Sequence, residues 1–124
     1  MTVKVLYVED NEDNVYMLSR RLKRIGMEVD VAPTGEEGVE KCLSGSYDLI
    51  LMDLSLPGID GWEAIEQIRR AGRDLPILAL SAHAMQEHID QALKSGANDF
   101  DSKPVDFTRL RGKLESLLSG GKDA

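Results

Sequence analysis

Acidic, hydroxyl and basic side chains stand directly after four of the apolar runs in this 124-residue chain. Glu9 and Asp10 follow the first run, and Asp53 follows the third. Ser81 follows the fourth run and Lys103 the fifth. If the runs are parallel strands of one sheet, these groups all emerge at the edge where open α/β sheets bind their ligands. Three carboxylates at close range repel one another, so the group calls for a hard divalent cation such as Mg²⁺. The pattern predicts a site that accepts a phosphoryl group.

Each of these residues has a simpler interpretation when it is considered alone. Asp53 could cap the turn after its strand, and Glu9 with Asp10 could form a helix-initiating acidic pair. Ser81 could start a helix, and Lys103 could be a solvated charge. Asp53 follows four apolar residues, however, and unpaired burial of a carboxylate raises its pKa and costs free energy. A neighbouring cation would keep Asp53 ionised as a nucleophile, and carboxylates can form covalent aspartyl-phosphate intermediates. The combination at four strand ends favours the phosphoryl site.

Five short apolar runs predict the strands that must position these groups. They span Val3–Val8, Met27–Val31, Leu49–Met52, Pro76–Leu80 and Asn98–Ser102. The continuous run Leu49–Met52 is typical of a central parallel strand that is covered on both faces.

Helical patterns with start and stop signals separate the strands. The signals are Asn11 as a cap and Gly26 as an end for the first helix, the capping pairs Thr34–Glu37 and Asp60–Glu63 for the second and third, Gly96 closing a helix over Ala84–Lys94, and Asp106 as a cap for the last. Regular alternation of strand and helix predicts an α/β fold, with a parallel sheet and helices on both of its faces.

Length and charge limit the classes of function that fit. The chain has 15 basic and 22 acidic residues, a formal charge of −7, which disfavours binding to nucleic acid or anionic membranes. No apolar run approaches the roughly 20 residues that span a bilayer, and the signal-peptide pattern is missing. We therefore expect a cytoplasmic protein without membrane insertion. The length predicts one domain over residues 1–119, followed by a flexible tail over 120–124.

With these motifs in place, the chain resembles the receiver domains of two-component response regulators over essentially its whole length. The matching stretches are Val8–Asn11, Leu51–Gly61, Ala79–Ala82, Gly96–Phe100 and Ser102–Pro104. The resemblance implies the flavodoxin-like receiver fold, a five-stranded parallel sheet in the order 2-1-3-4-5.

The resemblance also implies a role for each residue of the acidic group. Asp53 resembles the phosphoacceptor. Asp10 resembles a direct ligand of Mg²⁺ (or Mn²⁺), and Glu9 would act on the metal through water. Asp53 and the backbone carbonyl of Ser55 would supply the other protein ligands.

The remaining roles concern the response to phosphorylation. Lys103 would pair with the carboxylate and then with a phosphoryl oxygen, Ser81 would move to bond the phosphoryl group, and Phe100 would rotate inward as a switch aromatic. Our own hypothesis adds that Ser55 and His83 tune the lifetime of the phosphoryl group by controlling water access. A solvated helix-start histidine is the alternative for His83.

The implied function is a phosphoacceptor that signals in a two-component system or phosphorelay. The donor would be a phosphohistidine on a sensor histidine kinase or a histidine phosphotransfer protein. The fourth helix, fifth strand and fifth helix would then bind a downstream protein target. We expect a stand-alone receiver without a DNA-binding output domain, which is no enzyme beyond catalysing its own phosphorylation and slow dephosphorylation. The alternative is a receiver fragment of a hybrid histidine kinase or a larger regulator.

Other classes of function fit the residues less well. A small aspartyl phosphohydrolase usually has a general acid two residues after its nucleophile, where this chain has Ser55. A constitutive scaffold would typically have lost one of the site residues. A flavin carrier would have a hydroxyl-rich phosphate loop after the first strand.

Two further features call for a structural explanation. Asp101 stands where receiver domains generally carry an apolar residue, so it needs a polar partner or access to water. Tyr16 and Met17 on the first helix are predicted to face solvent, and we hypothesise that they help to dock a kinase helix.

Overall fold

A computed structural model describes residues 2–82 and 85–119 of the chain. Its strands form one parallel sheet in the order β2-β1-β3-β4-β5, as predicted. The strands are β1 (Lys4–Val8), β2 (Glu28–Ala32), β3 (Leu49–Asp53), β4 (Ile77–Ser81) and β5 (Asp99–Ser102). The predicted tail over 120–124 lies outside the described residues.

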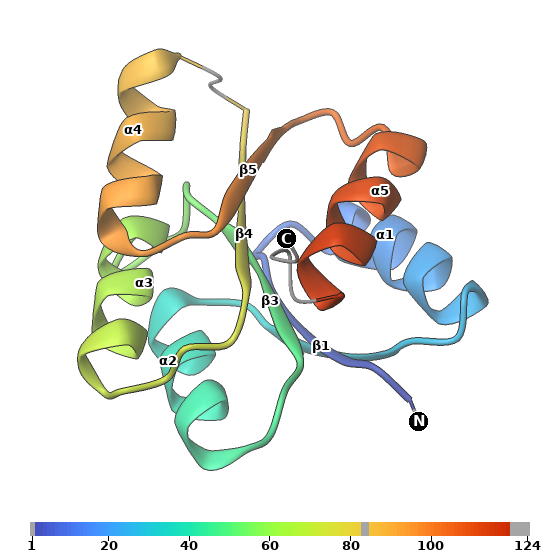
Figure 1. The fold of residues 1–124 in the computed structure, drawn as a ribbon, viewed down its shortest axis with the longest axis horizontal. Helices are drawn as coiled ribbons and strands as arrows, with labels where there is room; N and C mark the ends of the chain where they lie inside the picture. Colours follow the sequence, from blue (N-terminus) through green and yellow to red (C-terminus); the bar gives the residue numbers. More distant parts are fainter. Residues whose placement is uncertain (1, 83–84, 120–124) are drawn as a thin grey trace.

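Helices cover both faces of the sheet, which confirms the predicted fold class (Figure 1). They are α1 (Glu12–Arg24), α2 (Gly35–Ser44), α3 (Gly61–Arg70), α4 (Gln86–Ser95) and α5 (Phe107–Leu118). One apolar cluster joins the sheet to α1 and α5, and a second joins the opposite face to α2, α3 and α4. Among the described residues, the helices are too short or too polar to cross a lipid bilayer.

Strands β3 and β4 hold Asp53 and Ser81 at their ends, and burial and register fix both strands. All residues of β3 and of β4 are buried. Asp53, the last residue of β3, stands opposite Leu80, and Ser81 at the end of β4 stands opposite Ser102. A parallel register of this kind brings the carboxyl ends of the strands together at one edge of the sheet.

All four predicted side-chain caps form. Asn11 Oδ1 accepts the backbone N–H of Asn14, and Asp60 Oδ1 accepts that of Glu63, each at 2.9 Å. The caps Thr34 and Asp106 accept from the corresponding third residues of α2 and α5. These caps satisfy orphan N–H groups at helix starts and thereby fix the chain directly after β1 and before α3.

Several predicted boundaries move by one or two residues, among them the starts of β2, β5 and α4. Strand β2 begins at Glu28 rather than Met27, because the Met27 N–H bonds the Leu22 carbonyl and closes α1 around Gly26 at φ 95°. Strand β5 begins after Asn98, whose side chain accepts the N–H of Ile77. Helix α4 begins at Gln86, two residues later than predicted.

Candidate functional site

Three carboxylates converge at the carboxyl edge of the sheet, as predicted. Glu9, Asp10 and Asp53 each offer one oxygen, and these oxygens all lie within 4.8 Å of one another. Glu9 and Asp53 are buried, with exposed fractions of 1% and 3%, whereas Asp10 is exposed. The cluster therefore combines two fixed acids with one acid that faces solvent.

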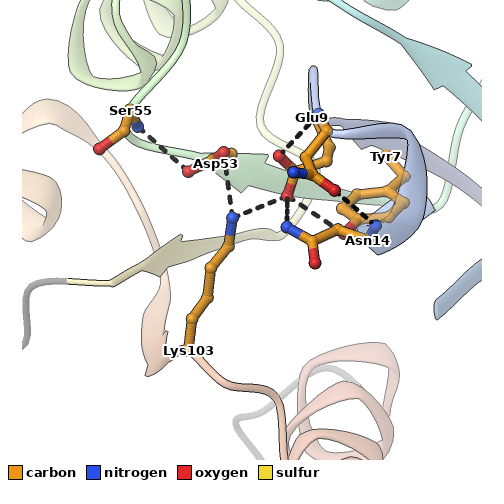
Figure 2. A network of polar contacts seen from close by, with 7 residues as sticks. Tyr7, Glu9, Asn14, Asp53, Ser55 and Lys103 are labelled. Atoms are coloured by element: carbon orange, nitrogen blue, oxygen red, sulfur yellow. Dashed lines mark hydrogen bonds and ion pairs between the residues drawn. The ribbon is translucent and has the colours of Figure 1, made fainter. Parts of the chain in front are cut away.

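Lys103 joins the two buried acids. Its Nζ donates to Glu9 Oε1 at 2.8 Å and to Asp53 Oδ2 at 3.1 Å (Figure 2). Its backbone N–H donates to the carbonyl of Ser81 at 2.8 Å, and the Lys103–Pro104 peptide bond is cis. The lysine therefore reaches both carboxylates from a backbone that is bonded to the end of β4.

The two serines of the predicted site come from different elements and differ in burial. Ser81 is buried at the end of β4, while Ser55 is exposed in the loop after β3. The Ser55 N–H donates to Asp53 Oδ1 at 3.1 Å. Since Lys103 bonds the other oxygen, both oxygens of Asp53 have a donor, and the orientation of the carboxylate is fixed.

Burial and the neighbouring charges shift the acids in opposite directions. Burial, together with the adjacent Glu9 carboxylate, raises the pKa of Asp53 to about 6. Burial opposes the ionisation of Glu9 most strongly, but the hydrogen bonds from Lys103, Asp53 and the Asn11 N–H and the charge of Lys103 together outweigh it and hold the pKa of Glu9 below its usual range. Burial disfavours the charged form of Lys103, yet both carboxylates together raise its pKa. The pair therefore consists of an ionised Glu9 and a more basic Asp53.

The donor set fits a hard divalent cation. Every candidate ligand is an oxygen, from Glu9, Asp10, Asp53 or the Ser55 carbonyl, and oxygen ligands are those that Mg²⁺ and Ca²⁺ take. An open cavity of about 530 Å³ lies over these residues and Lys103. Mg²⁺ keeps several waters and uses few carboxylates, so an open site with one exposed acid suits it.

Sequence reasoning missed the groups that hold Glu9. Glu9 Oε1 accepts the Tyr7 hydroxyl at 3.3 Å and Asn14 Nδ2 at 3.5 Å, and Oε2 accepts the Asn11 N–H at 3.2 Å (Figure 2). Asn11 was predicted only as a cap. Tyr7 lies on β1 and Glu9 directly follows it, and their spacing of two residues is the signal that could have identified this contact.

Phe100 and Asp101 lie on opposite faces of β5. Phe100 is 8% exposed and packs in the cluster with α3 and α4, and Lys113 donates to its carbonyl. The carboxylate of Asp101 is 3% exposed and accepts Arg109 Nε at 2.8 Å, so the polar partner that Asp101 requires comes from α5. His83 lies outside the described residues.

Comparisons with known proteins agree with this geometry. A sequence profile described as the response regulator receiver domain matches residues 5–115. The transcriptional regulatory protein CusR of Escherichia coli is 36% identical over 119 residues, which are 96% of this chain and 52% of CusR. The chain therefore spans about half the length of that relative.

Two solved structures are similar over nearly the whole chain. The receiver domain of the sensor histidine kinase PA1611 from Pseudomonas aeruginosa, which holds a magnesium ion in its active-site cleft, has a TM-score of 0.89 and 34% identity, covering 96% of this chain and 99% of that one. The receiver domain of Ssk1 from Saccharomyces cerevisiae, in complex with the phosphotransfer protein Ypd1, has a TM-score of 0.89 and 34% identity, covering 95% and 90%.

Proposed function

This chain belongs to the response regulator receiver domain family, and on that premise we propose that Asp53 accepts a phosphoryl group from a phosphohistidine in the presence of Mg²⁺. One observation carries the proposal. A buried carboxylate, bonded on both oxygens, lies beside two further acids and a lysine at the open edge of the sheet. This is the set of charges that phosphoryl transfer requires, since the reaction depends on positioning and charge neutralisation.

Each residue of the site has a separate role in the proposed phosphoryl transfer. An oxygen of Asp53 forms the new bond to phosphorus as the bond from phosphorus to the histidine nitrogen breaks, and the electron pair of that bond stays on the imidazole. Ser55 and Lys103 orient the carboxylate before transfer. Lys103 then pairs with a phosphoryl oxygen. Asp10, Asp53 and the Ser55 carbonyl would hold a divalent cation, with Glu9 acting through water, and the cation would supply further neutralisation of the phosphoryl charge.

The same site sets the signalling state. A phosphoryl group adds close to two negative charges and strong acceptor oxygens. Ser81 hydrogen-bonds this group, and Phe100 adjusts its packing between β5 and α4 in response. The surface of α4, β5 and α5 then changes its affinity for a downstream protein. The chain catalyses only its own phosphorylation and slow dephosphorylation.

We place the docking of the phosphodonor on α1, and we propose that the protein acts in the cytoplasm. Tyr16 and Met17 are 62% and 60% exposed. A groove of about 250 Å³ beside Met17 runs along Arg21 and Phe107 to Lys103. An amphipathic helix with acidic flanks suits this apolar groove and its basic rim. The complex of Ssk1 with Ypd1 supports a phosphotransfer protein as the partner.

Docking on α1 is tested by Met17→Glu. Phosphoryl transfer from a histidine phosphotransfer protein should slow about tenfold, the equivalent of 1.4 kcal/mol, while labelling by acetyl phosphate stays unchanged. Leu93→Glu on α4, where the replaced side chain is 47% exposed, is the matched control. Equal transfer rates in wild type and Met17→Glu would reject this surface.

The receiver acts either alone or as a part of a longer protein. CusR is a relative about twice as long as the matched region, and the PA1611 domain is part of a sensor kinase. We favour the stand-alone receiver, and the receiver of a hybrid kinase or larger regulator is the second candidate. The chemistry proposed for Asp53 is the same in both.

The decisive experiment is intact mass after incubation with acetyl phosphate, with and without Mg²⁺. Wild type should gain one phosphoryl group only with Mg²⁺, and Asp53→Asn should gain none. No gain in wild type under any condition would reject the proposal and favour a binding scaffold. Rapid release of inorganic phosphate at steady state would instead indicate a phosphohydrolase.

A further inference from the structure

Tyr7 is a buried phenol whose oxygen lies inside the polar network of the site. Its side chain is in the cluster beneath α1 and α5, and the residue is 1% exposed. Among the described residues, its hydroxyl bonds Glu9 Oε1 (Figure 2). Burial and the nearby carboxylates raise the pKa of Tyr7, so the hydroxyl keeps its proton and acts as a donor. A phenol in a fully apolar layer otherwise carries an unsatisfied polar group, which is costly.

The backbone fixes this contact. Tyr7 and Glu9 are two residues apart on and directly after β1, and side chains at that spacing point to the same face of a strand. The ring of Tyr7 is packed in the core, so the position of its hydroxyl is fixed. Glu9, in contrast, has three side-chain torsions, so contacts from other residues are needed to hold its carboxylate in one orientation.

Three donors share the same oxygen of Glu9. Lys103 Nζ is nearest at 2.8 Å, the Tyr7 hydroxyl follows at 3.3 Å and Asn14 Nδ2 at 3.5 Å. Lys103 also serves Asp53 at 3.1 Å. If the hydroxyl is removed, Glu9 loses a neutral donor and relies more on the lysine, at the expense of Asp53. The Tyr7 hydroxyl therefore influences the hydrogen bonding of both Glu9 and Asp53, although it contacts only Glu9.

We infer that Tyr7 is a positioning residue that holds Glu9 in the orientation needed for Mg²⁺ binding and keeps Lys103 available to Asp53. This inference rests on the proposed function of the site. Partners that lie one bond beyond the ligands of a metal site typically change its affinity or activity by about 10–100-fold. For a neutral donor at 3.3 Å we expect the lower end of that range, about tenfold.

The test uses Tyr7→Phe, which removes one oxygen and leaves the ring in the core. We would measure the Mg²⁺ dissociation constant by calorimetry and the Mg²⁺ concentration that half-saturates labelling by acetyl phosphate. Both should rise about tenfold. The matched control is Tyr47→Phe, which removes a hydroxyl bonded to Asp30 at 2.7 Å, away from the site, and should change neither value.

A double-mutant cycle with Glu9→Gln separates positioning from a general loss of structure. If Tyr7 acts through Glu9, Tyr7→Phe should cause little further loss of Mg²⁺ affinity in the Glu9→Gln background. Additive losses would overturn the inference, as would unchanged Mg²⁺ affinity in Tyr7→Phe or an equal loss in Tyr47→Phe. If wild type itself neither binds Mg²⁺ nor gains a phosphoryl group, the proposed function fails first, and the two failures are distinguishable.

Discussion

Lys103 Nζ donates to Asp53 Oδ2 at 3.1 Å across 50 positions of sequence. The contact ties the end of β5 to the end of β3 at the edge of the sheet. One ammonium group faces two buried carboxylates here, because Glu9 Oε1 lies at 2.8 Å from the same nitrogen. Without a divalent cation, the site would therefore hold an excess of buried negative charge, and this imbalance affects how stability depends on pH and on metal.

Asp53 should make stability depend on pH. Its pKa is raised to about 6, compared with about 3.9 in an unfolded chain. The folded state therefore binds the proton more tightly, and this residue lowers stability as pH rises from about 4 to about 6. At pH 7 in EDTA, Asp53→Asn should be more stable than wild type by about 1–3 kcal/mol.

Urea unfolding at a series of pH values checks this prediction. The stability difference between Asp53→Asn and wild type should grow through pH 4 to 6 and stay constant above. A difference that is the same at pH 4 and pH 8 would contradict the assigned cause, because burial of a charge matters only when the group is ionised.

Removal of the lysine should destabilise the protein in a metal-dependent way. Lys103→Met leaves Glu9 and Asp53 without their shared cation, and loss of one partner of a buried ion pair is strongly destabilising. Because the lysine is partly exposed and Glu9 keeps other donors, we expect a loss of about 2–4 kcal/mol in EDTA. Excess Mg²⁺ should restore part of it, since a divalent cation neutralises the same carboxylates.

Thermal unfolding with EDTA and with Mg²⁺ measures both effects. Lys94→Met, which replaces an exposed lysine on α4, is the control and should change stability by less than about 0.5 kcal/mol. If Lys103→Met lost the same stability with and without Mg²⁺, the lysine would be acting through packing rather than through its charge.

The partly buried ion pair between Asp101 on β5 and Arg109 on α5 should tolerate replacement of both residues by apolar ones, but not the loss of Arg109 alone. Asp101 is 3% exposed and bonds Arg109, and its Oδ2 has no hydrogen-bond partner within the described part of the chain. Arg109→Met leaves this carboxylate with only the Ser102 N–H at 2.9 Å and Lys113 Nζ at 3.9 Å, and it should cost about 1–3 kcal/mol, less than for a fully buried arginine. The double variant Asp101→Leu/Arg109→Met should return close to wild type, because an apolar pair suits the surrounding layer.

Chemical denaturation of the two single variants and the double variant completes this cycle. Arg111→Met removes an exposed pair with Glu115 and should change stability by less than about 0.5 kcal/mol. A double variant that is less stable than Arg109→Met alone would show that the ion pair contributes net stability to the fold.

Local signals explain why much of the fold could be predicted from the sequence. The caps at Asn11 and Asp60 form because a side chain and an N–H three residues later suffice. The meeting of Glu9, Asp53 and Lys103 follows from parallel strands that end at one edge. The strand order itself came from the family resemblance and not from any pattern in the residues.

The unpredicted contacts depend on where side chains of different elements point. Arg109 on α5 reaches Asp101 on β5 only because of how α5 packs on the sheet, and no spacing rule relates the two. The burial of Phe100 in this state likewise depends on the packing of α4. Tyr7 is predicted only as a residue of the first strand, because its bond to Glu9 depends on the conformations of both side chains.

Gly61, the first residue of α3, packs directly against the backbone of Asp53 and Leu54. A Cβ there would lie 2.4 Å from the Asp53 carbonyl oxygen and 2.6 Å from Leu54 Cα, both of them backbone atoms that cannot move aside alone. Gly61→Ala should therefore shift the chain at Asp53, lower stability by about 1–3 kcal/mol and slow labelling by acetyl phosphate. Gly112→Ala on α5 meets nothing within 4 Å and should instead stabilise the helix by about 0.5–1 kcal/mol, with labelling unchanged. Unfolding midpoints and labelling rates for the two variants check this contrast. Wild-type labelling in Gly61→Ala would mean that the loop after β3 can move without displacing Asp53.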